Sequence, residues 1–158
     1  MRKALVAVSV VMAVAVALVA AGCGKSRMSR ADFVAKANAD CKLYESRQNA
    51  IQFPTVNPIA AKTTHTQRAE WGLALKQVVD IGDAEIKELR KLSPPKELAD
   101  HYEDLLNAWQ EAYDTLRTGS VAAKKNDPET LKKKVPAGRA QLAKVGEQAK
   151  ALGLTSCG

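Results

Sequence analysis

The sequence predicts an all-α protein, an antiparallel up-down four-helix bundle with one disulfide, preceded by an apolar N-terminal segment. Three observations predict this architecture. Apolar residues after position 29 recur at spacings of three and four, and no segment alternates with a period of two. Prolines and glycines divide that stretch into four parts with mostly short connections, which favours antiparallel neighbours. Three cysteines are present, and two of them lie far apart within the helical part.

The first helix is expected to begin after Ser29, which forms a capping-box-like start with Asp32. Its apolar residues are spaced by four, three and seven, so they lie on one face of the helix. Phe53–Pro54 is expected to stop the helix, and residues 54–64 are expected to form a loop. The face consists of Phe33, Ala37, Cys41, Tyr44 and Ile51.

The second and third helices are separated by Ser93–Pro94–Pro95. We expect Ser93 to cap the third helix and Pro94 to occupy its first position. Gly119–Ser120 is expected to weaken the end of the third helix. The two apolar faces are Trp71, Leu75, Val78, Gly82, Ile86 and Leu89, and then Leu98, Tyr102, Leu105, Trp109, Ala112 and Leu116.

The fourth helix is expected to open with Asp127 as its cap and Pro128 at its first position. Pro136 should kink or interrupt it, because a proline restricts the residue before it and removes a hydrogen bond. Gly153 is expected to end it in the left-handed conformation, with Leu154 as the hydrophobic partner. Its apolar face is Leu131, Val135, Gly138, Leu142, Val145, Ala149 and Leu152.

The N-terminal segment has the order of a secretory signal peptide over residues 1–22. Arg2 and Lys3 form its basic start, residues 4–22 carry no charge, and the segment ends in small residues. The uncharged run of about 19 residues is also long enough to span a bilayer as a helix. An uncleaved membrane anchor is therefore the competing interpretation.

Cys23 favours a lipid anchor. Ala21, Gly22 and Cys23 resemble the lipobox of bacterial lipoproteins, although Ala20 replaces the usual leucine. In that family the thiol receives a diacylglyceryl group with chains such as palmitate, and a peptidase cuts before the cysteine. The resemblance implies a signal peptide at 1–22, a lipidated Cys23 with a tether over 23–29, and a bundle over 30–158. It also implies a lipid-anchored location on the extracytoplasmic face of the cell membrane. Ordinary cleavage beside an incidental cysteine remains an alternative.

The two other cysteines, Cys41 and Cys157, are expected to pair, because an exported compartment permits disulfides. We expect the first and fourth helices to be neighbours, which would bring the C-terminal tail back to Cys41. A buried free Cys41 with a frayed, reactive Cys157 is the alternative. No Cys-x-x-Cys is present, so the sequence does not indicate a metal knuckle or a thioredoxin-like site.

The segment after residue 22 has 22 basic and 17 acidic residues, a net charge of +5. Its basic side chains gather at Lys124, Lys125, Lys132, Lys133 and Lys134, around the predicted loop between the third and fourth helices. This basic tip is expected at the end away from the membrane, where it could meet an anionic wall polymer or an acidic envelope protein. A solubilising charge run is the alternative. Nucleic acid is not an expected partner, because no aromatic residues are interleaved for stacking.

The sequence predicts no catalytic residues, no metal site and no cofactor. His65 and His101 are the only histidines, and His101 has Glu97 one turn before it and Asp104 one turn after it. These three could form a weak divalent site, or simply a solvated helix face. Trp71 and Trp109 could line an apolar ligand pocket, but their positions on the apolar faces favour core packing. Phosphate-binding, dinucleotide and nucleophile-elbow patterns are absent from the sequence.

The segment after Cys23 also resembles a group of uncharacterised small secreted helical proteins of high-GC Gram-positive bacteria. The likeness rests on "ADFVAKANADC" at 31–41, "LRKLSPPKEL" at 89–98 and "ALGLTSCG" at 151–158. It implies export and a helical architecture, and it carries over no catalytic residue. The sequence therefore favours a non-enzymatic envelope binding or interaction module. The alternative is a small-ligand or metal-dependent protein that uses His101 and nearby carboxylates.

Overall fold

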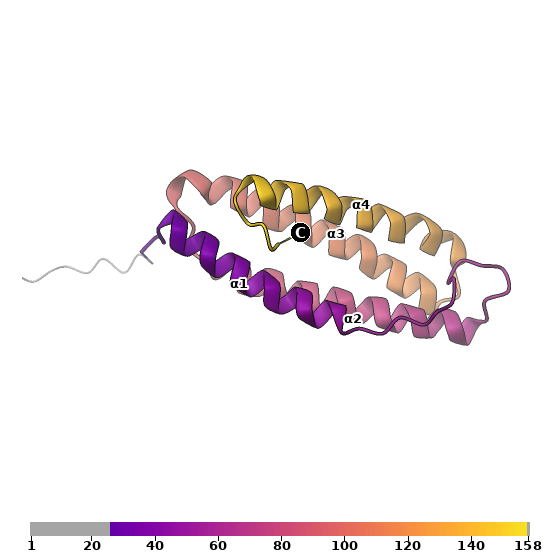
Figure 1. Cartoon of the computed structure of the whole chain (residues 1–158). Helices are drawn as coiled ribbons and strands as arrows, with labels where there is room; N and C mark the ends of the chain where they lie inside the picture. The colour runs from indigo at the N-terminus through magenta and orange to yellow at the C-terminus, as the bar shows by residue number, and fades with distance from the viewer. Residues whose placement is uncertain (1–25, 158) are drawn as a thin grey trace, which may run out of the picture.

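A computed structural model describes residues 26–157, and within this range the chain is helical without any strand. The four helices are α1 (Arg30–Asn49), α2 (His65–Leu89), α3 (Ala99–Lys124) and α4 (Pro128–Ala151). A single turn of 3-10 helix, η1 (Lys96–Leu98), precedes α3. Consecutive helices run in opposite directions along a common axis (Figure 1). For the described residues, the prediction of an all-α architecture with four helices is confirmed.

The helices pack in the order of the chain: α1 on α2, α2 on α3, and α3 on α4. No Cα atom of α1 lies within 8 Å of a Cα atom of α4. The expectation that these two helices are neighbours is therefore wrong. The C-terminal tail, residues 153–157, folds back toward α1 (Figure 1). The four helices thus form an open row, and the tail connects its two edges.

The tail is attached to α1 by polar contacts and by sulfur. The side-chain amide of Asn38 donates to the Gly153 carbonyl over 3.2 Å, and its oxygen accepts from the Ser156 N–H over 2.8 Å. The sulfur atoms of Cys41 and Cys157 lie 2.06 Å apart, and their Cα atoms lie 5.0 Å apart. These are the distances of a disulfide. Both cysteines are buried in the core.

The start of α1 follows the prediction, since the Ser29 hydroxyl accepts a hydrogen bond from the Asp32 N–H over 3.1 Å. The helix ends at Asn49, so the loop covers residues 50–64 and starts earlier than expected. A true capping box begins α2. The Thr64 hydroxyl accepts from the Gln67 N–H, and the Gln67 side chain accepts from the Thr64 N–H.

The third helix differs from the prediction at both ends. Ser93 does not cap it, because η1 intervenes and α3 begins at Ala99 without a side-chain cap. The Ser93 carbonyl instead accepts from the Met28 N–H over 2.9 Å. Gly119 and Ser120 do not weaken its end, because both are buried and α3 continues to Lys124. The Ser120 hydroxyl donates to the Gly72 carbonyl of α2 over 2.9 Å, so a tertiary contact holds this turn.

The fourth helix begins as predicted, with the Asp127 side chain accepting from the Thr130 N–H over 2.9 Å. It continues without interruption through Pro136. Pro136 is exposed, while Val135 and Gly138 beside it are buried, so packing on α3 holds the helix despite the missing N–H.

The end of α4 also follows the prediction. Gly153 has a φ of 87°, and its N–H donates to the Lys150 carbonyl. The N–H of the fully buried Leu154 donates to the Ala149 carbonyl. This is a Schellman motif, in which the left-handed residue satisfies the last carbonyls of the helix. It also turns the chain toward α1 (Figure 1).

One core joins the apolar faces of all four helices and the tail. Phe33 of α1 meets Tyr102 of α3 edge-on, with 4.8 Å between ring centroids. Gly82 allows α2 and α3 to approach closely, because a Cβ at this position would lie 2.1 Å from the Tyr113 ring. Trp71 and Trp109 are both buried, as the core interpretation predicts.

Candidate functional site

The predicted lipidation residue, Cys23, lies outside the described residues. Over residues 26–157, no helix combines the length and the apolar character that crossing a membrane requires. The turn between α3 and α4 lies at the opposite end of the bundle from the start of α1 (Figure 1).

The basic tip is built on helices and not on a loop, which corrects its predicted setting. Lys124 is the last residue of α3, and Lys125 is its C-cap. The connecting turn is short, with Asn126 at a φ of 58° and Asp127 as the next cap. Lys132, Lys133 and Lys134 are exposed on the second turn of α4. In the described part of the chain, none of the five lysines forms an ion pair.

The histidine cluster is only partly assembled. His101 and Asp104 line one shallow pocket between α3 and the end of α4, together with Gln148. Glu97 lies on η1 and does not line this pocket. Over residues 26–157, no three side chains of His, Cys, Asp or Glu come together in a way that would hold a metal ion.

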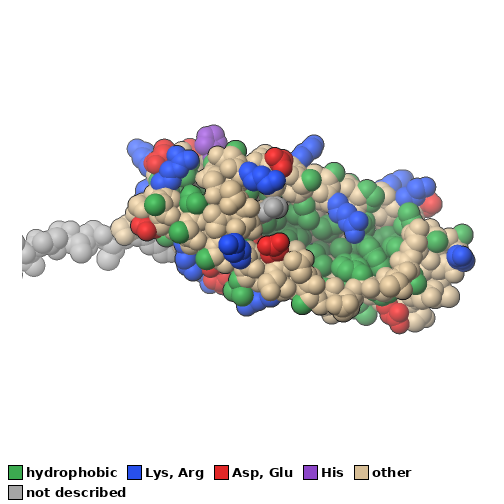
Figure 2. All heavy atoms as spheres, viewed as in Figure 1, with side chains coloured by type: hydrophobic (Ala, Val, Ile, Leu, Met, Phe, Trp, Pro, Cys, Tyr) green, Lys and Arg blue, Asp and Glu red, His purple; other side chains and the backbone are tan. Residues whose placement is uncertain are grey.

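A groove lies between α1 and α4. It follows from the open row, since the two edge helices do not meet. Figure 2 shows a hollow on this face with a floor of hydrophobic side chains. The cavity is about 300 Å³, at the lower end of the range for small-molecule sites. All four helices and the tail line it, through Cys41, Glu45, Gln48, Glu85, Trp109, Tyr113, Leu142, Ala143, Ser156 and Cys157.

Glu85 is the unusual residue of this groove. It lies on α2 and is only 4% exposed. Within residues 26–157, no hydrogen bond or ion pair reaches its carboxyl group. Burial and, to a smaller extent, the nearby charge of Glu45 on α1 together raise the pKa of Glu85 from 4.5 to about 8. The groove therefore contains a carboxyl group that burial keeps protonated near neutral pH.

The floor beside Glu85 is aromatic. Trp109 and Tyr113 lie one turn apart on α3, and both are buried. The Tyr113 hydroxyl accepts a hydrogen bond from the Gln48 amide of α1 over 2.8 Å. Burial raises the pKa of Tyr113 to about 12, so this phenol stays neutral at physiological pH. Trp109 thus belongs to the core and also lines the groove, whereas Trp71 belongs to the core and does not line the groove.

Sequence reasoning missed Glu85, although its position carries a signal. It lies three residues after Gly82 and four before Leu89, both members of the apolar face of α2. A glutamate inside such a face is either paired across the core or directed into a cavity. The choice depends on residues of other helices, so the sequence of α2 alone does not make it.

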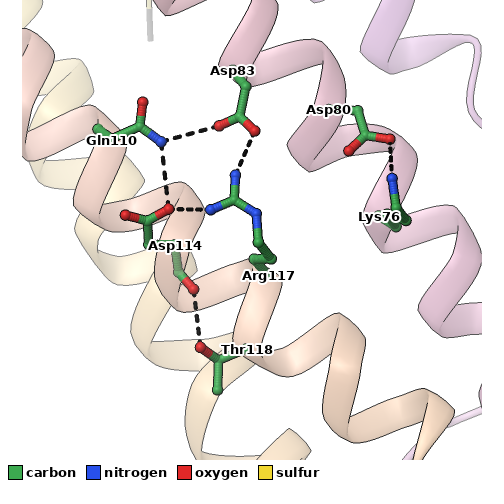
Figure 3. A network of polar contacts seen from close by, with 7 residues as sticks. All are labelled: Lys76, Asp80, Asp83, Gln110, Asp114, Arg117 and Thr118. Atoms are coloured by element: carbon green, nitrogen blue, oxygen red, sulfur yellow. Dashed lines mark hydrogen bonds and ion pairs between the residues drawn. The ribbon is translucent and has the colours of Figure 1, made fainter.

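Two other polar clusters of the molecule are internally satisfied. Arg117 of α3 forms ion pairs with Asp83 of α2 and with Asp114, while Gln110 donates to the Asp83 carboxylate over 3.1 Å (Figure 3). Arg68 of α2 is buried and donates to the carbonyls of Pro58, Ala60 and Thr63 and to the side chain of Asn126. These clusters hold elements together, whereas the groove carboxyl has no such partner.

Comparison with known proteins adds no relative. The chain matches no protein-family model, no curated protein and no solved structure.

Proposed function

We propose that this protein is a lipid-anchored extracytoplasmic binding protein whose ligand site is the groove between α1 and α4. The groove is the observation that carries the binding role. It combines an apolar floor with a few polar groups, which is the usual character of a small-molecule site. Its lining offers one buried carboxyl group and no histidine, lysine or arginine, so we propose binding without a reaction.

The proposed location rests on Cys23 and on the apolar segment before it. Two acyl chains hold a protein stably at a bilayer, since each buried CH₂ contributes about 0.8 kcal/mol. Lys25, Arg27 and Arg30 would then lie beside the headgroups. We further propose that Cys41 and Cys157 form a covalent disulfide, so that an up-down four-helix bundle is tied at its open side.

The basic tip supports a second contact in the envelope. Its five lysines lie on either side of the turn between α3 and α4, which is at the opposite end of the bundle from the start of α1 (Figure 1). If Cys23 is at the membrane, this end projects outward and presents positive charge to an anionic wall polymer or an acidic envelope protein. Such a contact is electrostatic and is therefore weakened by salt.

Location and binding are tested separately. Cys23→Ala should leave an uncut precursor without diacylglyceryl mass, and a wild-type mature N-terminus elsewhere than Cys23 would contradict the anchor.

For the groove, Ala143→Trp fills the cavity from α4. It should abolish binding of a neutral aryl-alkyl probe to the full-length protein in lipid nanodiscs. Ala137→Trp is the matched control, because Ala137 is exposed on α4 and does not line the groove. Equal binding by both variants would contradict the groove.

A further inference from the structure

The groove contains a buried acidic side chain, Glu85, in largely apolar surroundings. Glu85 is 4% exposed, lines the cavity and has no bonding partner within residues 26–157. Its carboxyl oxygens are not among the fully buried side-chain atoms that lack a hydrogen-bond partner, so a molecule in the open cavity can reach them. Arg68 is equally buried on the same helix, but four acceptors surround it. Glu85 is therefore set apart as a group whose partner would come from outside the chain.

The charges around the cavity indicate which class of ligand it would bind. Glu45 of α1 is a second carboxylate on the lining, and no lysine, arginine or histidine lines the groove. An anionic ligand such as a fatty acid would be repelled by Glu45 and would force Glu85 to remain protonated. A cationic ligand would be attracted by Glu45 and would favour the ionised form of Glu85. The groove thus has the opposite charge preference from the basic tip.

The floor of the cavity suits the same partner. Trp109 and Tyr113 offer aromatic surface beside the carboxyl group, and Leu142 covers it from α4. Aromatic rings bind both apolar bodies and cations, the latter through the negative faces of their π systems. A metal ion is a less suitable occupant, because within residues 26–157 no three His, Cys, Asp or Glu side chains come together to hold one.

We propose that the groove binds an organic cation, a protonated amine whose nitrogen donates to the Glu85 carboxylate and whose apolar body rests on Trp109, Tyr113 and Leu142. This inference rests on the proposed function, since it names the ligand class of the same groove. On binding, the ligand stays an ammonium ion, and Glu85 changes from carboxylic acid to carboxylate. Its proton passes to the solvent, so binding near neutral pH releases up to one proton.

The test uses three probes with one apolar body: 4-phenylbutylamine, 4-phenylbutanol and 4-phenylbutyrate. Each is titrated calorimetrically at pH 7 into the full-length protein in lipid nanodiscs, with empty nanodiscs subtracted. We expect the amine to bind at least about tenfold more tightly than the alcohol, and the carboxylate to bind most weakly. Repeating the amine titration in two buffers of different ionisation enthalpy should show proton release.

The Glu85→Gln variant keeps the shape of the side chain and removes its charge. It should reduce amine affinity to that of the alcohol, leave the alcohol unchanged and abolish proton release. Glu111→Gln, on an exposed position of α3, is the matched control and should change nothing.

The possible results separate the two proposals. Equal affinities for amine and alcohol in the wild type, or an amine preference that survives Glu85→Gln, would overturn the cation inference while leaving the groove intact. If no probe binds the wild type, the groove itself is not a ligand site, and the proposed function fails with the inference.

Discussion

Removal of the Cys41–Cys157 link should loosen the protein at one edge of the helix row. The proposed bond joins residues separated by 116 positions. In the chain-entropy model, closing a loop of this length stabilises the folded state by about 5 kcal/mol. A typical domain is stable by about 5–15 kcal/mol, so the link supplies a large share. The double variant Cys41→Ala/Cys157→Ala should therefore unfold at a much lower urea concentration.

The loss should not be uniform along the chain. Among the helices, only α2 has a backbone close to that of α1, and α1 has four buried residues: Phe33, Ala37, Cys41 and Tyr44. Without the sulfur link, the two hydrogen bonds of Asn38 are the polar ties left between α1 and the tail. We expect α1 to exchange its amide hydrogens much faster in the double variant, because local opening then requires less free energy. The amides of α3, which packs on both α2 and α4, should lose protection only as global stability falls.

Three measurements check this reasoning. Urea unfolding gives the change in stability, and hydrogen exchange gives its distribution along the chain. Leu43→Ala, at an exposed position of α1, is the control for side-chain removal on the same helix. Thiol counting on denatured, unreduced protein carrying Cys23→Ala tests the bond directly. Two reactive thiols in that protein, or an unchanged urea midpoint in the double variant, would refute the argument.

Three further outcomes are expected. Changing Lys132, Lys133 and Lys134 to Gln should weaken association with isolated wall polymer in a sedimentation assay, and added salt should weaken the association of the wild-type protein. Binding that is independent of salt and survives the substitution would mean that these lysines only keep the protein soluble. Arg68→Met should cost about 2–4 kcal/mol in urea unfolding, because the partly buried loop carbonyls lose their donor. A change below about 0.5 kcal/mol, the range of ordinary surface substitutions, would contradict this. The folded protein holds a proton on Glu85 up to about pH 8, whereas the unfolded chain releases it near 4.5. Stability should therefore fall by about 3 kcal/mol from pH 5 to pH 8, and Glu85→Gln should flatten that slope.

Local rules predicted the ends of α4 well, because the residues that decide them are adjacent in sequence. Asp127 and Pro128 start the helix, and Gly153 with Leu154 ends it, each through contacts within a few positions. The failures at Ser93 and Ser120 have another cause. Ser120 donates to a carbonyl of α2, so a tertiary partner holds that turn. Ser93 does not cap α3, because η1 lies between them.

The groove was beyond sequence reasoning for a similar reason. Apolar spacing shows which face of each helix is buried. It does not show whether the four helices close into a ring, with the first beside the fourth, or lie in an open row. The choice depends on contacts between distant elements, such as Asn38 with the tail. The sequence shows Glu85 on an apolar face, yet its exposure to a cavity follows only from the separation of α1 and α4.

Because α1 and α4 are separated, the short C-terminal tail sets the distance between them. The spacing between adjacent helices is set by the side chains at their interfaces, but the gap between α1 and α4 has no interface of its own. Residues 153–157 span it, with their start fixed by the Schellman turn of α4 and their far end held at Cys41 and Asn38 of α1. The length of the tail therefore determines the width of the groove. Lengthening or shortening the tail would change that width without altering any helix that lines the groove.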